Sequence, residues 1–465
     1  MIDFSLAVRN LLRNGRRSFA TFVALVIGST SILLFGGYRK NIEYTMQTAY
    51  VRAGGHLQIQ HRDLFLYGSG NAVKYSIAGY EEIMAVISGD DVLGKMVTVV
   101  SPTLQFGGVA SNADADVSRT VVGLGIVGAD RNRMRAWNEF KLPEDSPYFA
   151  LEGAGPDAAV IGHGVARVLM LCGPLKVEDC PKPFEEPAAG GVDLPADIAA
   201  LAARDAPDGK SRSASSLPKI ELLASSAGGA PNVVSLEIVR AERQGFKELD
   251  ELYLMLQFPQ AQRLIYGRAK PKATAIMVQL EHNAQLEPAK ARITALLAER
   301  APGQPLTVID FREMNPFFVQ TVQMFDAIFG FIFVLIASIV LFTVGNTMST
   351  AVMERTVEIG TLRAMGLRQR GVQRLFVTEG MLLGVAGAVS GALLALLVST
   401  VINRLGLTWL PPGSGHELPL LMRVWGETPT IFGTTLGLIA IAAFSAWWPA
   451  RRASRLVIVD ALRHV

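Results

Sequence analysis

Four long apolar runs dominate the pattern of hydrophobic and polar positions. They cover residues 18–38, 325–349, 375–402 and 430–448. A helix needs roughly 20 consecutive apolar residues to cross the hydrocarbon core of a bilayer, and each run is about that long or longer. We therefore predict a transmembrane helix over each of these four ranges.

The stretch between the first two runs, residues 39–324, has the shorter periodicities of a folded domain. Alternating or Val-rich stretches predict strands at 55–60, 95–105, 119–127 and 273–280, and helical spacing predicts helices at 80–87, 246–265 and 287–299. We expect the two ends of this stretch to form one subdomain and the middle a second. The predicted fold class is an α-helical membrane protein with four transmembrane helices and a large α+β extracytoplasmic domain between helices 1 and 2.

Within that domain, residues 185–231 are crowded with Ala, Gly, Ser, Pro and Asp and show no sustained apolar period. This composition predicts a flexible insertion, interpreted either as a tolerated loop or as a contact for a partner. Cys172 and Cys180 precede it. In an oxidising compartment they would form a local disulfide, and the alternative is two unpaired thiols.

The arginines predict the orientation of the chain. Basic residues are concentrated in the 1–17, 350–374 and 449–465 segments, and four spans place all three segments on one side. Because such residues favour the cytosolic side, we expect both termini in the cytosol and residues 39–324 and 403–429 outside. Arg39 and Lys40 run against this rule. The expected location is the bacterial plasma (inner) membrane.

The 1–17 segment carries apolar residues on one helical face and arginines elsewhere. It can lie in the headgroup layer as an amphipathic helix, or it can pack on protein. A basic stretch before an apolar run is also typical of a signal peptide. The run is longer than usual for one, and Phe35-Gly36-Gly37-Tyr38 is a poor cleavage site, so we favour an uncleaved anchor.

Composition argues against several functions. The chain has 465 residues, of which 50% are hydrophobic and 18% charged, and a net charge of +3 is too small to indicate nucleic-acid binding. Two cysteines and six scattered histidines provide no zinc-ligand spacing, so no metal site is expected. The 209–211 stretch has the Gly-Lys-Ser ending of a phosphate-binding loop, but Arg204 replaces its first glycine. We predict no catalytic residue, no cofactor and no enzyme activity, with energy supplied by another protein.

The 350–374 segment, between the second and third runs, is the strongest candidate site. Glu354 and Glu358 lie four apart, so a helix would place two like charges on one face. Ile359, Leu362 and Met365 form a narrow apolar stripe beside them. Two interpretations remain open: a docking helix offered to a cytosolic partner, or a solvated loop whose charges only fix topology.

The same segment resembles the signature loop of FtsX-like ABC transporter permeases, the family that includes MacB, LolC and LolE. The motif runs from Asn346 to Gly366, and Glu379-Gly380, 449–453 and 460–463 also resemble the family's pattern. The match is specific over about the last 140 residues. In that family the loop implies a coupling helix seated in a groove of the ATPase subunit. The residues that the resemblance assigns to docking are Glu354, Arg355, Glu358, Ile359, Gly360, Leu362, Arg363, Ala364, Met365 and Gly366.

Two features of the third run leave alternatives open. Glu379, a carboxylate at the edge of a span, can bond the docking helix to that span and transmit force, or it can snorkel to the interface. Small residues at three-to-four spacing, namely Gly380, Gly384, Gly387 and Gly391, let another helix approach closely. That helix could belong to this chain or to another subunit.

The resemblance implies a permease subunit that pairs with a second permease, the same or related, and with two copies of an ABC ATPase subunit that binds ATP and Mg²⁺. Extraction of lipoprotein or lipid, with a periplasmic carrier, is the first expectation for its function. MacB-type efflux of drug or peptide is the second, and an FtsX-like signalling scaffold that regulates a cell-wall hydrolase is the third. MacB carries its ATPase on the same chain, and this sequence shows none. No nucleic acid is expected among the partners.

Overall fold

A computed structural model describes residues 2–13, 15–68, 70–143, 149–178, 180, 217–244, 247–410, 417–455 and 457. The chain divides into two compact units. Unit 1 comprises residues 1–46, 317–409 and 418–465, and unit 2 comprises residues 47–316 and 410–417.

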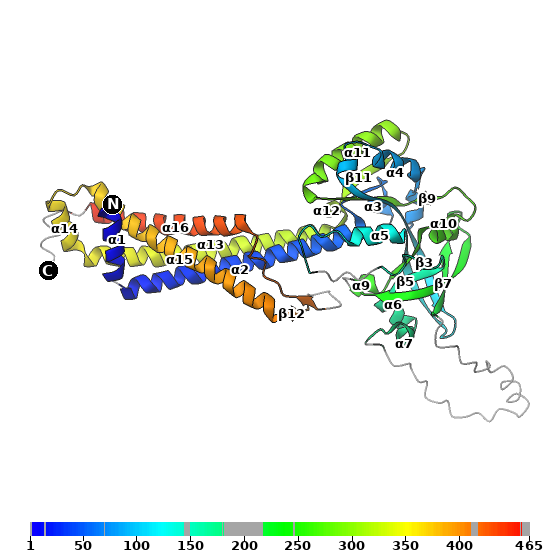
Figure 1. The fold of residues 1–465 in the computed structure, drawn as a ribbon, viewed down its shortest axis with the longest axis horizontal. Coiled ribbons are helices and arrows are strands. Elements are labelled where there is room, and N and C mark those ends of the chain that lie inside the picture. The colour runs from blue at the N-terminus through cyan, green and yellow to red at the C-terminus, as the bar shows by residue number, and fades with distance from the viewer. Residues whose placement is uncertain are drawn as a thin grey trace, which may run out of the picture. The chain divides into compact units, whose positions relative to one another are not determined.

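Unit 1 is a bundle of long helices. Its elements are α1 (Ile2–Arg13), α2 (Gly15–Gly54, which continues into unit 2), α13 (Pro316–Glu354), α14 (Thr356–Ala364), α15 (Gln369–Leu405), β12 (Thr408–Trp409), β13 (Leu418–Pro419) and α16 (Thr428–Ser454). Figure 1 shows α2, α13, α15 and α16 running side by side. These four helices are long and apolar enough to cross a membrane.

The four helices share one apolar core. Leu25 and Ile32 of α2 meet Val344 of α13, Leu383 of α15 and Leu438 of α16 in a single buried cluster. The glycines of α15 bring its neighbours close: a Cβ added at Gly384 would lie 2.8 Å from Ala442 Cβ of α16, and one at Gly391 would lie 2.7 Å from Val26 O of α2. The glycine face of the third run therefore packs within this chain.

Each of the four helices extends beyond its predicted span. The first runs to Gly54 instead of residue 38, and the second begins at Pro316 instead of residue 325. At 1.5 Å per residue, a 40-residue helix is about 60 Å long, twice the ~30 Å hydrocarbon core. Apolarity marks only the part that contacts lipid, whereas the helix continues past it.

Unit 2 is built on one nine-stranded sheet in the order β11-β1-β10-β3-β4-β8-β5-β7-β6. The strands of unit 2 are β1 (Leu57–His61), β2 (Ile77–Ala78), β3 (Val97–Asn112), β4 (Val117–Ile126), β5 (Ala158–Gly162), β6 (Lys219–Ser225), β7 (Pro231–Glu242), β8 (Tyr253–Gln257), β9 (Lys272–Ala273), β10 (Ala275–Leu280) and β11 (Leu306–Asp310). β2 and β9 form a separate pair.

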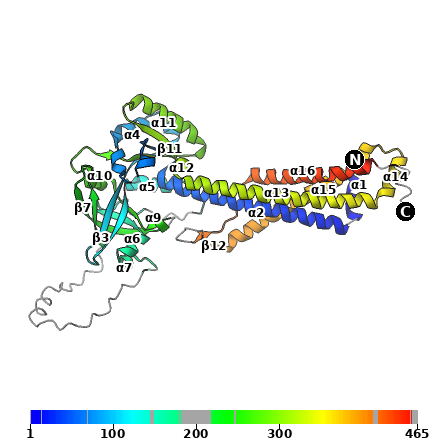
Figure 2. The same cartoon turned by 180° about the vertical axis from the view of Figure 1, so that it is seen from behind.

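The helices of unit 2 are mostly short. They are α3 (Leu64–Tyr67), α4 (Tyr80–Ser88), α5 (Gly128–Arg135), α6 (His163–Val168), α7 (Cys172–Leu175), α9 (Lys247–Asp250), α10 (Phe258–Tyr266), α11 (Leu286–Arg300) and α12 (Phe311–Met314), with 3₁₀ turns η1 (Ala72–Tyr75), η2 (Leu93–Lys95) and η3 (Asn283–Gln285). Figure 2 shows α11 beside α4 and β11. The structure confirms the predicted fold class of four apolar helices with an α+β domain between the first and second.

The long strand β3 joins the two predicted subdomains into one sheet. Its first half pairs with β10, and its second half pairs with β4 and β6. The sequence predicts two subdomains because their segments are far apart along the chain. β3 has 16 residues, which is long enough to pair with strands of both.

One prediction within unit 2 is wrong, and the predicted range of another is too long. The helix expected over 246–265 contains β8, whose residues Leu254, Met255 and Leu256 are buried in the sheet; a short apolar run does not distinguish a strand from a helix. The flexible insertion expected over 185–231 ends in β6, where Ile220, Leu222 and Ala224 alternate inward. Residues 185–216 of that insertion lie outside the described residues, so the rest of the prediction is not tested.

Candidate functional site

The 350–374 segment is a broken helical turn at one end of the bundle. α13 ends at Glu354, Arg355 is non-helical, and α14 follows from Thr356. Gly366 has a φ of +99°, a left-handed conformation that suits glycine, and it lets the chain reverse into α15. The predicted helix is therefore only nine residues long.

Apolar side chains are exposed at the end of α13, on α14 and just after α14, but they are not all the residues that the sequence predicted. Met353 is 75% exposed and Met365 is 72% exposed, with Val357 exposed between them. Ile359 is only 3% exposed, because it packs with Val372 and other residues of α15 and α16. The exposed stripe is thus Met353, Val357 and Met365, and Ile359 anchors the helix to the bundle.

The remaining predicted docking residues divide between these two faces. Ala364 and Gly366 are exposed, Gly360 and Arg355 are buried, and Leu362 and Arg363 are half-buried.

The two glutamates of the segment are bound within the chain. Arg17 donates both Nη atoms to the Glu354 carboxylate, at 2.9 and 2.8 Å. Arg13 Nη2 donates to both carboxylate oxygens of Glu358, at 2.6 and 2.9 Å. The N-terminal helices therefore contact the two carboxylates that were expected to face outward.

Glu379 lies beneath these pairs and is 2% exposed. Its Oε1 accepts hydrogen bonds from Asn10 Nδ2 at 2.6 Å and from Arg355 Nη1 at 3.0 Å. Arg355 Nη2 also donates to Asn10 O at 3.1 Å. The carboxylate thus joins α15 to the residue between α13 and α14, and it is buried instead of reaching the interface.

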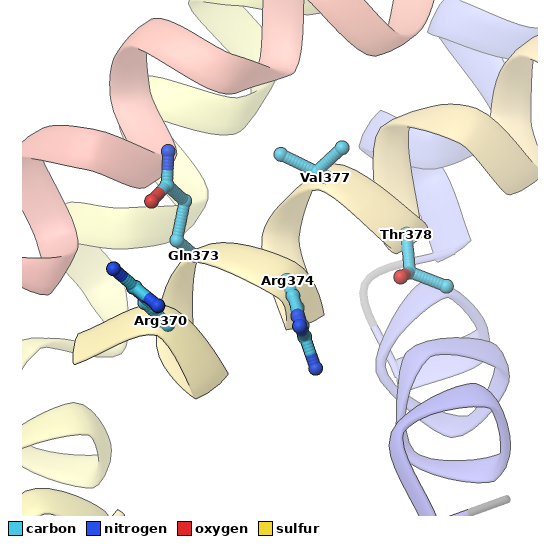
Figure 3. A pocket seen from close by; sticks show the side chains of 5 residues that line it. All are labelled: Arg370, Gln373, Arg374, Val377 and Thr378. Carbon is cyan, nitrogen blue, oxygen red and sulfur yellow. The ribbon is translucent and has the colours of Figure 1, made fainter. Parts of the chain in front are cut away.

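A hollow of about 360 Å³ lies on the first turns of α15. Figure 3 shows the five side chains that line it, Arg370, Gln373, Arg374, Val377 and Thr378, all projecting from that helix. In the sequence these arginines indicate only the topology. The five lining residues recur at spacings of three and four, which is typical of one helical face and indicates a shared surface.

Unit 2 contains two further features. The structure joins Cys172 and Cys180 in a disulfide with Cα atoms 6.2 Å apart.

A groove of about 860 Å³ is lined by apolar Phe106, Val109 and Leu223 together with Lys74 and other residues. Among the described residues, no three His, Cys, Asp or Glu side chains cluster in a way that could hold a metal ion.

Residues 328–458 match the family described as FtsX-like permease C-terminal. This range includes the 350–374 segment, Glu379 and most of α13, α15 and α16.

Curated relatives agree with this match. An uncharacterized ABC transporter permease of Methanocaldococcus jannaschii is 29% identical over 26% of this chain and 28% of its own length. The lipoprotein-releasing system transmembrane protein LolC of Neisseria meningitidis is 28% identical over 51% of this chain and 57% of its own. The macrolide export ATP-binding/permease protein MacB of Bordetella avium is 27% identical over 50% of this chain and 34% of its own.

The chain therefore spans less than two thirds of each of these relatives. The four apolar helices and the family match make it a multi-pass membrane protein. Residues 328–458 carry the FtsX-like permease C-terminal domain, and the chain is similar to ABC transporter permeases named LolC and MacB.

Proposed function

We propose that this chain is the membrane-spanning permease subunit of an ABC transporter, driven by ATP hydrolysis in a separate subunit. The observation that carries this proposal is the 350–374 segment: a short helix with an exposed apolar face, fixed to α15 through the buried Arg355–Glu379 pair. A helix that is bound by a partner and fixed to α15 in this way can transmit a movement of the partner to that transmembrane helix.

The exposed stripe of Met353, Val357 and Met365 supports docking over a solvated loop. Large apolar side chains exposed along one short segment, here from the end of α13 to the residue after α14, are typical of a surface that contacts another protein. The hollow formed by Arg370 and Arg374 adds positive charge nearby. We expect the partner to be an ATPase subunit in two copies, with ATP and Mg²⁺ bound there and no cofactor on this chain.

Force would then pass from α14 to α15 and onward through the close helix contacts at Gly384 and Gly391. α2 and α13 are the helices through which the chain enters and leaves residues 47–316. We propose that their motion drives unit 2 on the outer side of the inner membrane, with both termini in the cytosol. A second permease subunit, the same or related, would complete the assembly.

For the substrate we propose lipoprotein or lipid, passed to a periplasmic carrier. The LolC relative supports this choice, and so does the groove in unit 2, whose apolar wall could contact an acyl chain while Lys74 meets an acidic group. Efflux of a drug or peptide is the second candidate, because the MacB relative matches an almost equal share of the chain.

Co-purification tests the permease assignment. The double variant Met353→Asp/Met365→Asp places two charges on the apolar stripe, so an ATPase subunit that co-purifies in detergent with the wild type should be lost. Thr408→Asp, an exposed position in β12, is the matched control and should retain the ATPase. Wild-type protein that carries no ATPase, or a double variant that keeps its ATPase, would contradict the proposal.

Transport measured in reconstituted vesicles distinguishes lipoprotein extraction from drug efflux. In vesicles containing the complete complex and ATP, extraction predicts release of a triacylated lipoprotein into a soluble carrier. Efflux instead predicts ATP-dependent movement of a macrolide with no lipoprotein release.

A further inference from the structure

Glu354 and Glu358 are the two acidic side chains of the 350–374 segment, and both are engaged by the N-terminal helices. We propose that Arg13 and Arg17 are positioning residues of the coupling apparatus. Their ion pairs with Glu358 and Glu354, called the latch below, hold α14 in place, so the two carboxylates act through the latch and do not contact the ATPase. This inference rests on the proposed function.

The two arginines and the two glutamates of the latch have the same spacing, and each pair flanks a boundary between two helices. Arg13 ends α1 and Arg17 lies in the first turn of α2, while Glu354 ends α13 and Glu358 lies in the first turn of α14. Each pair of like charges is four residues apart, and they meet in antiparallel order, Arg13 with Glu358 and Arg17 with Glu354. The repulsion between like charges within each pair is thereby offset across the contact.

A second, partly buried set of contacts lies next to the latch. Asn10 of α1 donates to Glu379 and accepts from Arg355, and the Thr21 and Thr347 hydroxyls are 2.7 Å apart between α2 and α13. These contacts fix the N-terminal helices against α13 and α15 independently of the exposed pairs. The latch therefore positions α14 relative to helices that these other contacts already hold together.

The ion pairs of the latch are exposed and therefore weak. Arg13, Arg17 and both glutamates are each between about 38% and 54% exposed at the side chain, and exposed ion pairs contribute little individually. Loss of both pairs should shift the position of α14 without unfolding the bundle. The surface left to the ATPase is then the apolar stripe of Met353, Val357 and Met365.

Charge reversal and charge exchange test the latch in the reconstituted complex. The acidic double variant Glu354→Lys/Glu358→Lys and the basic double variant Arg13→Glu/Arg17→Glu should each lower substrate moved per ATP hydrolysed by about two- to thirtyfold, the effect of losing two exposed pairs. The quadruple variant restores both pairs with exchanged signs and should recover most of that ratio.

The matched control is Arg9→Glu/Arg16→Glu. Both arginines are exposed on the same helices and form no ion pair with a residue that the structure describes, so the same charge change should leave the ratio unaltered. If the quadruple variant remains as uncoupled as the acidic double variant, the carboxylates contact the ATPase directly and the latch is refuted.

A crosslink separates this inference from the proposed function. In the Cys172→Ser/Cys180→Ser background, a short bifunctional thiol reagent should join Arg13→Cys to Glu358→Cys in membranes, whereas Arg9→Cys with Glu358→Cys should not react. No crosslink at the first pair would overturn the latch even where the ATPase still co-purifies. Loss of the ATPase from wild-type protein would overturn the permease assignment instead.

Discussion

Glu379 and Arg355 form a buried ion pair. Glu379 accepts from Arg355 at 3.0 Å and from Asn10 at 2.6 Å, with little solvent access to either charged group. Removing one partner from a buried pair leaves an uncompensated charge, which costs about 3–5 kcal/mol.

We therefore expect Glu379→Gln to lower the melting temperature of the detergent-solubilised protein clearly. Glu358→Gln, which removes an equal charge from an exposed pair, is the control and should change it little. Replacing both partners, in Glu379→Gln/Arg355→Met, should recover part of the loss because no unpaired charge remains. Equal melting temperatures for Glu379→Gln and Glu358→Gln would contradict the buried pair.

His56 makes unit 2 sensitive to acid. Burial lowers the pKa of His56 to about 4, so the folded state holds the neutral ring at pH 7. Its Nδ1 accepts a hydrogen bond from the Leu280 backbone N–H at 3.1 Å, and protonation would abolish that acceptor. Because the folded pKa is below the unfolded value near 6.5, stability is complete above about pH 6.5 and is lost as pH falls toward 4.

Unfolding by urea between pH 7 and pH 5 should show this loss. Tryptophan fluorescence is a suitable signal, since the Trp137 ring lies edge-on to His56 with centroids 4.9 Å apart. His56→Gln can still accept from Leu280 but cannot titrate, so its unfolding midpoint should fall less over the same range. Parallel pH profiles for the two proteins would mean that His56 is already charged or exposed in the fold.

At the scale of elements, the sequence predicted which segments are helices better than where they break. The four apolar runs and the helix at 287–299 all appear, because each has a long and regular period. The break at Arg355 was not predicted. It depends on Glu379 and Asn10, which come from other helices and are far away in the sequence.

Which residues of α14 are buried could also not be predicted from the sequence of that helix alone. Spacing alone grouped Ile359 with Met365, although one packs against α15 and the other is exposed. Which face turns inward is decided by Val372 and Phe376, and a single-helix pattern contains no information about them. The ion pairs of Glu354 and Glu358 were hidden for the same reason, since their partners lie more than 300 residues earlier.

The glycines of α15 give a prediction for the bundle. A Cβ at Gly391 would lie 2.7 Å from the backbone oxygen of Val26, so Gly391→Ala must push α2 and α15 apart and should cost about 1–3 kcal/mol. Ser29 and Thr30 of α2 also donate to backbone oxygens of α15 at this contact, at 3.0 Å each. These hydrogen bonds would lengthen with the same displacement.

Gly330→Ala in α13 is the matched control, because an added Cβ there would have no atom within 4 Å. Alanine is also the better helix former, so this variant should be neutral or slightly more stable. The measurement is thermal unfolding in detergent for both variants. A Gly391→Ala protein as stable as Gly330→Ala would show that α2 and α15 are not in close contact.

At the scale of the whole molecule, the ends of several helices meet at one end of the bundle. α1 contacts the 350–374 segment through Arg13, and Ala450 and Ala453 of α16 pack with Ile359 in one cluster. The three arginine-rich segments therefore lie together in unit 1. This arrangement agrees with four crossings, since an even number returns the chain to its starting side, and the excess of arginine favours the cytosol.

Labelling of single cysteines tests the topology. With Cys172 and Cys180 replaced by Ser, the chain has no other cysteine, so Thr361→Cys on α14 and Ser225→Cys at the end of β6 each report one exposed site. In intact cells a membrane-impermeant maleimide should label Ser225→Cys once the outer membrane is permeabilised, and should label Thr361→Cys only after the inner membrane is opened. Arg9→Cys should behave like Thr361→Cys, because α1 and α14 are joined by the Arg13–Glu358 pair. If positions 225 and 361 react under the same condition, a cytosolic ATPase could not drive unit 2 from across the membrane, and the permease mechanism would fail together with the four-span topology.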